Sequence, residues 1–375
     1  MRVLSLLPFF TFGGAEKQAR ILAEALHASG DDVEVWAFER ADGDDPLQER
    51  LEAAGIRTRL LPFRLERLSA DRGMALTALA LSALVHRGGF DVVLPWTYYP
   101  NVLAGLLPYF GYRGGVIWNQ RGVDDIVRPT AWEDLIDRSR TCWASNSETG
   151  AAFVCRRFGV KPDDITVVRN ALAPLVPRYG RETWRRRLQA SADDVVVTMV
   201  ANLFPNKRHA VVLEGLAILR KSGLRVVVAL AGYAPAPQFE AAVRAAIGAM
   251  GPHVRMLGSV ADVAGLLQAT DIATLASNST EGCSNSILEY MASGLPVVCS
   301  RLPAFVEMMP PDHDAFFDVD DAGGFASAVQ RLIERPALAA QMGERLRTHV
   351  AERFGGGQMV VSWARLLARA ADLSR

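Results

Sequence analysis

The sequence of 375 residues contains few cysteines and almost no lysine. Its four cysteines are widely spaced and form no Cys-x-x-Cys pair, so the chain lacks the disulfide framework of a small secreted domain. Only four of its 41 basic residues are lysines, and 41 acidic residues balance them to a formal net charge of zero. Neither half of the chain is strongly basic, which argues against a nucleic-acid-binding protein. These absences favour a globular protein of a reducing, cytoplasmic compartment.

The chain also lacks an uninterrupted apolar segment long enough to cross a membrane. Residues 92–112 carry no charged side chain over 21 positions, but Pro95, Pro100 and Pro108 interrupt them. A strand, a loop and a buried helix are therefore predicted there in place of a membrane span. The apolar start, residues 1–8, is short and has no cleavage region after it, so we predict a buried strand and no signal sequence.

The sequence does contain a repeated alternation of apolar strands and helices. Strands are predicted at residues 2–7, 33–38, 56–61, 92–95, 116–118 and 141–144, and again at 195–200, 226–231, 254–257, 272–275 and 297–299. Helices are predicted between many of these strands, including one over residues 74–85 and one over 208–221. Continuous apolar strands separated by helices indicate parallel sheets covered on both faces, which is an α/β architecture.

A segment without regular periodicity divides this alternation into two parts. Residues 170–180 contain two prolines and follow neither the helical nor the strand period, as expected of a linker. We predict a Rossmann-like first domain over residues 1–170 and a Rossmann-like second domain over 171–355, facing each other across a cleft. A helix over residues 356–375 has apolar side chains at helical spacing and is predicted to pack back on the first domain.

Two loops follow strands in the way that phosphate-binding loops do. Gly13 and Gly14 follow the first strand and open a helix, so the backbone can approach a phosphate or a sugar closely; a tight strand-to-helix turn is the alternative. In the second half, Glu281 and Glu289 flank seven residues at the start of another helix. The N–H groups of residues 282–286 suit a diphosphate, and a carboxylate suits the two hydroxyls of a ribose. A helix-capping motif is the alternative interpretation of this second loop.

The second loop resembles the donor-site signature of family 4 glycosyltransferases. The resemblance rests on the spacing Glu281-x7-Glu289 and on the Gly-Leu-Pro sequence at residues 294–296. Four further segments resemble that family, so the likeness extends over most of the chain; they are residues 13–16, 168–171, 200–207 and 254–258. Members of the family are retaining enzymes with the GT-B fold, which consists of two Rossmann-like domains.

The resemblance implies a role for each matching residue. Glu281 would lie against the transferred sugar, Lys207 would neutralise the departing diphosphate, and Glu289 would hold the ribose. The predicted catalytic residues are Glu281, Lys207 and Arg121. The predicted donor-binding residues are Gly13, Gly14, Asn202, Lys207, Arg208, Gly258, Glu281, Gly282, Cys283, Ser284, Asn285, Ser286 and Glu289. No metal site and no bound cofactor are expected, because the lysine and the helix N–H groups would supply the electrostatic stabilisation.

The chain departs from the family pattern at two positions. Asn202 stands where the family often has an arginine, so half of the usual phosphate clamp is missing. Arg208 is the predicted substitute, although adjacent helical residues point about 100° apart. The family also often has a histidine after the fifth strand, where Gln120 or Arg121 would take its place in this chain. Arg121 could pair with a phosphate through two parallel hydrogen bonds.

These features predict a metal-independent, retaining hexosyltransferase. It would move a hexose or an N-acetylhexosamine from a nucleotide-sugar to a glycan, lipid-linked or small-molecule acceptor in cell-surface polysaccharide or glycoconjugate biosynthesis. A UDP-sugar is favoured over a GDP-sugar on the breadth of the family alone. The sugar–phosphate bond would stretch to an oxocarbenium-like state while a phosphate oxygen takes the proton of the acceptor.

Three alternatives predict different behaviour. Asp-x-Asp triplets at residues 42–44, 312–314 and 318–320 allow a metal-dependent transferase, which a chelator would inhibit. A nucleotide-sugar epimerase or a phosphorylase on the same fold is the second alternative, and an epimerase would convert the donor without an acceptor. The third is a non-catalytic nucleotide-sugar sensor or scaffold, which the missing arginine at Asn202 favours and which would bind the donor without turnover.

A basic stretch in the first domain predicts peripheral contact with a membrane. Apolar residues alternate there with Arg57, Arg59, Arg64, Arg67 and Arg72. Such a segment suits anionic lipid near a lipid-linked acceptor. Glu66 and Asp71 dilute the charge, and an ordinary solvated surface is the alternative. The predicted location is cytoplasmic, with peripheral contact at the inner face of the cytoplasmic membrane.

Overall fold

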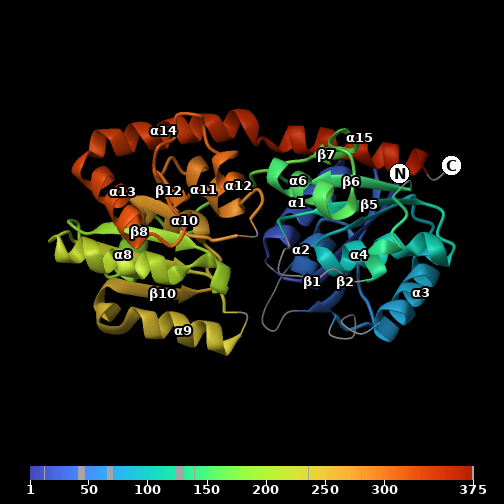
Figure 1. Cartoon of the computed structure of the whole chain (residues 1–375), viewed down its shortest axis with the longest axis horizontal. Helices are drawn as coiled ribbons and strands as arrows, with labels where there is room; N and C mark the ends of the chain where they lie inside the picture. The colour runs from blue at the N-terminus through green and yellow to red at the C-terminus, as the bar shows by residue number, and fades with distance from the viewer. Residues whose placement is uncertain are drawn as a thin grey trace. The chain divides into compact units, whose positions relative to one another are not determined.

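The computed structural model describes residues 1–11, 13–40, 47–65, 71–123, 131–138, 140–234, 236–279 and 281–373. The chain divides into two compact units, each built around one parallel sheet (Figure 1). The first unit comprises Met1–Ala171 and Gly356–Arg375, and the second comprises Leu172–Gly355.

The sheet of the first unit has seven strands within the described residues, in the order β3-β2-β1-β4-β5-β6-β7. The strands are β1 (Arg2–Phe10), β2 (Asp32–Arg40), β3 (Arg57–Leu60), β4 (Val92–Pro95), β5 (Gly115–Gln120), β6 (Thr141–Ser145) and β7 (Ile165–Val167). All of their pairings are parallel. The register begins with Arg2 opposite Asp32 in β2 and Val3 opposite Val92 in β4.

Helices cover both faces of this first sheet. They are α1 (Gly14–Ala28), α2 (Leu47–Ala53), α3 (Asp71–Gly88), α4 (Tyr98–Leu106), α5 (Ala131–Asp134), α6 (Glu148–Phe158) and α15 (Gly356–Asp372), with 3-10 turns η2 (Leu107–Phe110) and η3 (Pro162–Asp164). Because successive strand residues point to opposite faces, Val3 and Leu7 pack with α1, α2 and α15, whereas Leu4 and Leu6 pack with α3, α4 and α6. The C-terminal helix α15 contributes buried Trp363, whose ring lies 6.1 Å from that of Trp96.

The sheet of the second unit has six strands within the described residues, in the order β10-β9-β8-β11-β12-β13. The strands are β8 (Val195–Val200), β9 (Val226–Ala231), β10 (Val254–Gly258), β11 (Ile272–Leu275), β12 (Val297–Ser300) and β13 (Phe316–Phe317), and all are parallel. The central strand β8 pairs with β9 along its whole length and with β11 from Val197 to Met199.

The second unit packs its helices around a large apolar core. They are α7 (Arg181–Arg187), α8 (His209–Lys221), α9 (Pro237–Ile247), α10 (Val263–Ala269), α11 (Asn285–Ala292), α12 (Pro303–Val306), α13 (Ala322–Glu334) and α14 (Pro336–Arg353), with 3-10 turns η4 (Pro205–Lys207) and η5 (Gly248–His253). Val197 and Met199 of β8 belong to the large core, whereas Val196 faces the smaller cluster of Trp184 and Leu188.

The predicted α/β class with parallel sheets is confirmed. The predicted bounds are correct for four strands, at residues 92–95, 195–200, 226–231 and 272–275. The sequence prediction lacks β7 and β13, because strands of three and two residues are too short to show a period. The uncharged segment forms β4, buried α4 and η2, as predicted. Among the described residues, no helix is long and apolar enough to cross a membrane.

Candidate functional site

The strand order of the second unit identifies where a ligand would bind. The chain leaves β8 toward β9 on one side, and it leaves β11 toward β12 on the other side. The loops that follow β8 and β11 therefore diverge, and in open parallel sheets ligands bind in the crevice at this point of reversal. Both loops carry residues that the sequence predicted for the donor site.

Lys207 and Glu281, 74 positions apart in the chain, meet at this point. Lys207 ends η4 after β8, and Glu281 lies in the loop between β11 and α11. The Lys207 Nζ forms an ion pair with Glu281 Oε1, which also accepts a hydrogen bond from Ser277 Oγ at 2.7 Å. The side chains are 20% and 10% exposed, so both charges are held at a largely buried position that remains open to solvent.

The N-terminus of α11 lies beside this ion pair in the chain. Ser284 caps the helix, and its hydroxyl accepts a hydrogen bond from the N–H of Ile287 at 3.4 Å. The Ser286 hydroxyl donates to the carbonyl oxygen of Val200 at 2.7 Å, which fixes the first turn of α11 to the end of β8. The N–H of Ser284 donates to the sulfur of Met308 at 3.2 Å, and a thioether sulfur is a weak acceptor.

Glu289 and Tyr290 are buried in the second turn of α11. The Tyr290 hydroxyl accepts a hydrogen bond from the N–H of Val200 at 2.6 Å, and burial raises the pKa of Tyr290 far above its ordinary value. The tyrosine therefore remains neutral and holds α11 against β8. Gly282 and Cys283, which precede the helix, are also buried, whereas Asn285 is partly exposed.

The other predicted residues of the second unit have defined partners or positions. Asn202 accepts a hydrogen bond from the N–H of Tyr233 at 3.3 Å and so joins the loops after β8 and β9. Arg208 adopts a left-handed conformation (φ 44°) between η4 and α8, and its guanidinium contacts Asp320 at 2.5 Å. Lys207 and Arg208 therefore point to different partners. Gly258 ends the edge strand β10, two strands away from β8.

His209 does not add a second positive charge beside Lys207. It is buried in the first turn of α8, and this burial lowers the pKa of His209 to about 4. The hydrogen bond to the carbonyl oxygen of Ala201 partly opposes that shift. The imidazole is consequently neutral near pH 7, and the positive charge at this end of the sheet comes from Lys207 and Arg208.

In the first unit, the loops that follow β1 and β4 occupy the same place in the strand order as those that follow β8 and β11. They carry different residues. Gly13 precedes α1, and a Cβ at Gly13 would lie 2.0 Å from Glu16 Oε2, so only glycine allows the Glu16 carboxylate to fold back over the start of the helix. Gly14 is the first residue of α1. After the neighbouring strand β4, Thr97 precedes α4 with φ 72° and ψ 176°, a region that is essentially restricted to glycine.

Arg121 lies at the end of β5 in the first unit. Its guanidinium lies 4.8 Å from the centre of the Trp96 ring and donates to Asn170 Oδ1, and both contacts orient it. Gln120 is buried, accepts a hydrogen bond from Trp118 and donates to the carbonyl oxygen of Gly122 at 2.6 Å. Of these two candidates, the partly exposed Arg121 is the one that could reach a ligand.

Sequence reasoning did not identify Ser277 as part of the site. Its hydroxyl holds Glu281, and its own N–H donates to Ser300 Oγ at 2.9 Å. This chain of hydrogen bonds connects the loop after β11 to the end of β12. The only sequence signal was a serine within the conspicuous loop, because the partner Ser300 is 23 positions away.

The Asp-x-Asp triplets do not form a common cluster in the described part of the chain. Asp312 pairs with Arg345, Asp314 with Arg331, and Asp320 with Arg208, whereas Asp42 and Asp44 lie outside the described residues. No group of three or more His, Cys, Asp or Glu side chains among the described residues has an arrangement that could hold a metal ion.

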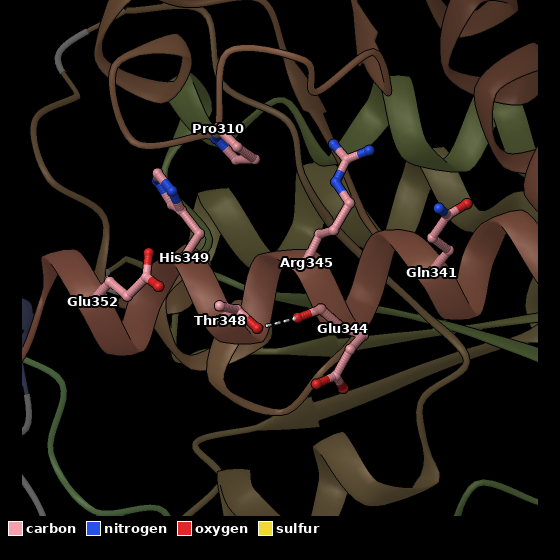
Figure 2. A pocket seen from close by; sticks show the side chains of 7 residues that line it. All are labelled: Pro310, Gln341, Glu344, Arg345, Thr348, His349 and Glu352. Carbon is pink, nitrogen blue, oxygen red and sulfur yellow. Dashed lines mark hydrogen bonds between the residues drawn. The ribbon is translucent and has the colours of Figure 1, made fainter.

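The pocket in Figure 2 is lined by residues other than the predicted donor residues. It has a volume of about 460 Å³ and lies along α14. Pro310 lines it together with the α14 side chains Gln341, Glu344, Arg345, Thr348, His349 and Glu352. None of the predicted donor-site residues lines this surface hollow, so it does not contribute to the site at the end of β8.

Two family models match the chain, one in each unit. Residues 12–174 match the family described as Glycosyltransferase Family 4, and residues 194–335 match the family described as Glycosyl transferases group 1. The chain belongs to the family 4 glycosyltransferases. The family resemblance of the Glu281-x7-Glu289 block is thereby confirmed, and so is the GT-B fold, which the two parallel-sheet units constitute.

Individual relatives of this family 4 glycosyltransferase are distant. It is 28% identical over 238 residues to the MMP alpha-(1->4)-mannosyltransferase of Mycolicibacterium hassiacum, covering 60% of this chain and 54% of that protein. It is 30% identical over 118 residues to the lipopolysaccharide core biosynthesis glycosyltransferase LpsE of Rhizobium meliloti, covering 31% of this chain and 34% of that protein. The matched segments thus span about half of the first relative and a third of the second.

A solved structure has the same fold over almost the entire chain. The crystal structure of Anabaena Alr3699/HepE in complex with UDP and glucose superposes with a TM-score of 0.82. The match covers 98% of this chain and 99% of that chain at 20% sequence identity. At that identity the likeness establishes the fold alone.

Proposed function

We propose that this family 4 glycosyltransferase moves a hexose or an N-acetylhexosamine from a nucleotide-sugar, with a UDP-sugar favoured, to a glycan or lipid-linked acceptor. The proposal rests mainly on one observation, the Lys207–Glu281 ion pair at the end of β8, next to the N-terminus of α11. A cation and the N–H groups at a helix N-terminus suit a diphosphate, and a neighbouring carboxylate suits sugar hydroxyls.

Donor binding would separate Lys207 from Glu281 and give each of them a new partner in the donor. The diphosphate carries more negative charge than Glu281 and would attract Lys207 Nζ, while its oxygens accept hydrogen bonds from N–H groups at the start of α11. Glu281, held by Ser277, would then accept hydrogen bonds from hydroxyls of the sugar. Glu289 would hold the ribose through its two carboxylate oxygens.

The reaction would proceed on one face of the sugar. The bond between C1 and the phosphate oxygen breaks, and the acceptor oxygen forms its bond to C1 on the same face. The acceptor proton passes to the departing phosphate oxygen, so the configuration at C1 is retained. Lys207 and the α11 N–H groups stabilise the charge that develops on the diphosphate, a role that a metal ion performs in other transferases. Arg121 remains a proposed catalytic residue.

Support for the substrates comes from the similar proteins. A UDP-sugar is favoured because the solved Anabaena protein is in complex with UDP and glucose. A glycan acceptor in lipopolysaccharide or a related polysaccharide is favoured by the lipopolysaccharide core glycosyltransferase among the relatives. A mannosyl donor is the alternative that the mannosyltransferase favours.

A thermal-shift screen combined with product analysis tests this function. The purified chain is melted with UDP, GDP, TDP and ADP and their common sugar conjugates, with and without a chelator. A ligand at about 100 times its Kd stabilises the folded state by ~2.7 kcal/mol, so one selective shift that the chelator leaves unchanged is expected. Donor binding without transfer or slow hydrolysis would favour the scaffold, and conversion without acceptor would favour the epimerase.

A further inference from the structure

The outward face of α3 in the first unit is apolar. Met74, Ala78, Leu81 and Val85 pack into the core, and α3 lies at the periphery of the first unit (Figure 1). On the opposite side of the helix, Leu76 is 68% exposed and Leu79 is 53% exposed, and Ala83 is exposed beside them. Large apolar side chains of a soluble helix normally face the core, so this helix is apolar on both sides.

The turn η2 extends this apolar surface. The hydroxyl of Ser82 on α3 donates to the carbonyl oxygen of Phe110 at 3.0 Å, which fixes η2 alongside the helix. Tyr109 and Phe110 of η2 are 59% and 37% exposed. We call Leu76, Leu79, Ala83, Tyr109 and Phe110 the α3–η2 patch. Exposed large apolar side chains on two adjoining elements are typical of a surface that contacts another apolar phase.

The charge around the patch is positive. Arg72 and Arg87 stand at the two ends of the helix, Arg113 follows η2, and all three are exposed. Residues 72–123 contain a single acidic side chain, Asp91, which accepts a hydrogen bond from the N–H of Arg2. Within the described part of the chain, none of these three arginines forms an ion pair.

We propose that the α3–η2 patch docks the protein on the surface of an anionic membrane. The leucines and aromatic rings enter the interface between lipid headgroups and acyl chains, and the three arginines contact lipid phosphates. Lipid is the proposed occupant because exposed apolar side chains lie between uncompensated cations, which is the arrangement of an interfacial helix. The inference is independent of the donor site, which belongs to the second unit.

The docking surface differs from the basic stretch that the sequence suggested. Arg57 of that stretch pairs with Asp32 and Glu34, and the guanidinium of Arg59 lies over the Trp36 ring at 5.1 Å. Arg67 lies outside the described residues. Arg57 and Arg59 therefore have partners within the protein. Arg72, the last arginine of the basic stretch, also belongs to the proposed docking surface.

Vesicle co-sedimentation of the full chain tests the proposal. The probes are vesicles of phosphatidylcholine alone and vesicles that also contain phosphatidylglycerol. We expect the wild type to bind the anionic vesicles more strongly, with an affinity that falls as salt is added. Leu76→Gln/Leu79→Gln should lower the partition coefficient at least about tenfold, because both apolar anchors are lost. Arg87→Gln/Arg113→Gln should lower it by roughly tenfold on anionic vesicles only.

Ile218→Gln/Val361→Gln is the matched control, because it removes two exposed apolar side chains elsewhere, on α8 and α15. This variant should bind like the wild type, and cooperative melts should show that every variant is folded. Absent binding, equal binding to both vesicle types, or equal losses in the control and the leucine variant would each overturn the proposal. A dimer in solution that the leucine variant separates would also overturn it, because a second copy would then cover the patch.

Discussion

The two units have the same strand order around their central strands but different chemistry where that order reverses. In the second unit a lysine and a glutamate meet there beside a helix N-terminus. In the first unit the same place has two glycines, a strained threonine after the next strand and an arginine stacked on tryptophan nearby. Topology thus determines where a ligand can bind, whereas the loop residues determine which ligand it is. We propose that the second unit binds the diphosphate and that the first unit binds the acceptor.

The units also differ in the burial of their histidine side chains. In the second unit burial lowers the pKa of His209 and of His313 to about 4. In the first unit His27 and His86 are exposed. Among the described residues, the buried histidines therefore belong to the second unit, and the following changes test the contrast between the units.

The largest expected effect comes from Lys207→Ala, which removes the cation of the second unit. Loss of one preorganised charge at a leaving group costs about 10²–10³ in kcat. The measurement is steady-state transfer from the donor that the thermal-shift screen identifies. Lys221→Ala, which removes an exposed lysine at the end of α8, is the control and should keep full activity. If Lys207→Ala keeps full activity, the proposed role of the Lys207 charge at the leaving group is wrong.

Acid should destabilise the second unit before the first. His209 and His313 bind protons more weakly in the folded state (pKa about 4) than at their ordinary pKa of 6.5. The unfolded chain therefore takes up more protons between pH 6.5 and about 4, and stability is lost as the pH falls through this range, by up to about 1.4 kcal/mol per pH unit for each histidine. Hydrogen exchange, corrected for intrinsic rates, should show earlier loss of protection in β8 and β9 than in β1 and β2.

His313→Leu sharpens this pH test. Both ring nitrogens of His313 are buried and have no hydrogen-bond partner among the described residues. The substitution should therefore make the pH dependence of the second unit shallower, whereas His86→Gln in the first unit should leave it unchanged. Equal acid sensitivity of the two units would contradict the contrast.

Ser277→Ala should have a smaller effect on the second unit. It removes the hydrogen bond that positions the Glu281 carboxylate, and a bond to a charged group contributes about 1.5–3 kcal/mol, or roughly tenfold in kcat at the lower limit. Donor affinity should change less than kcat if the serine acts through Glu281. Ser279→Ala, in the same loop but hydrogen-bonded only to its neighbour Asn278 among the described residues, is the control. Equal effects of both variants would indicate a general loss of loop structure.

The smallest expected effect is that of Arg121→Ala on donor affinity. Because Arg121 belongs to the first unit, we expect the Kd for the nucleoside diphosphate to stay within about twofold of the wild type, while the KM for the acceptor rises. Calorimetric titration and acceptor-dependent kinetics measure the two quantities. If Arg121→Ala lowers donor affinity as much as Lys207→Ala does, the assignment of the donor to the second unit alone is wrong.

Much of this architecture could be predicted from the sequence, because buried parallel strands are continuous apolar runs. Val195–Val200 is one example with correct bounds. The Glu281-x7-Glu289 block located the loop because both glutamates and the helix start are local in sequence. Partners such as Ser277 for Glu281 and Asp320 for Arg208 could not be predicted, because they depend on how loops from different strands approach each other. The α3–η2 patch was missed for a related reason, since an apolar helix sequence does not show which face remains uncovered.

The central claim is that a nucleoside diphosphate displaces Glu281 from Lys207 at the end of β8. Titration calorimetry of UDP, and of the nucleotide selected by the screen, into wild type, Glu281→Gln and Lys207→Ala tests this exchange most directly. The account predicts that Glu281→Gln binds the nucleotide more tightly than the wild type, because the competing carboxylate charge is gone, yet transfers sugar more slowly. It also predicts that Lys207→Ala binds at least about tenfold more weakly. Weaker nucleotide binding in Glu281→Gln, or unchanged binding in both variants, would contradict the account.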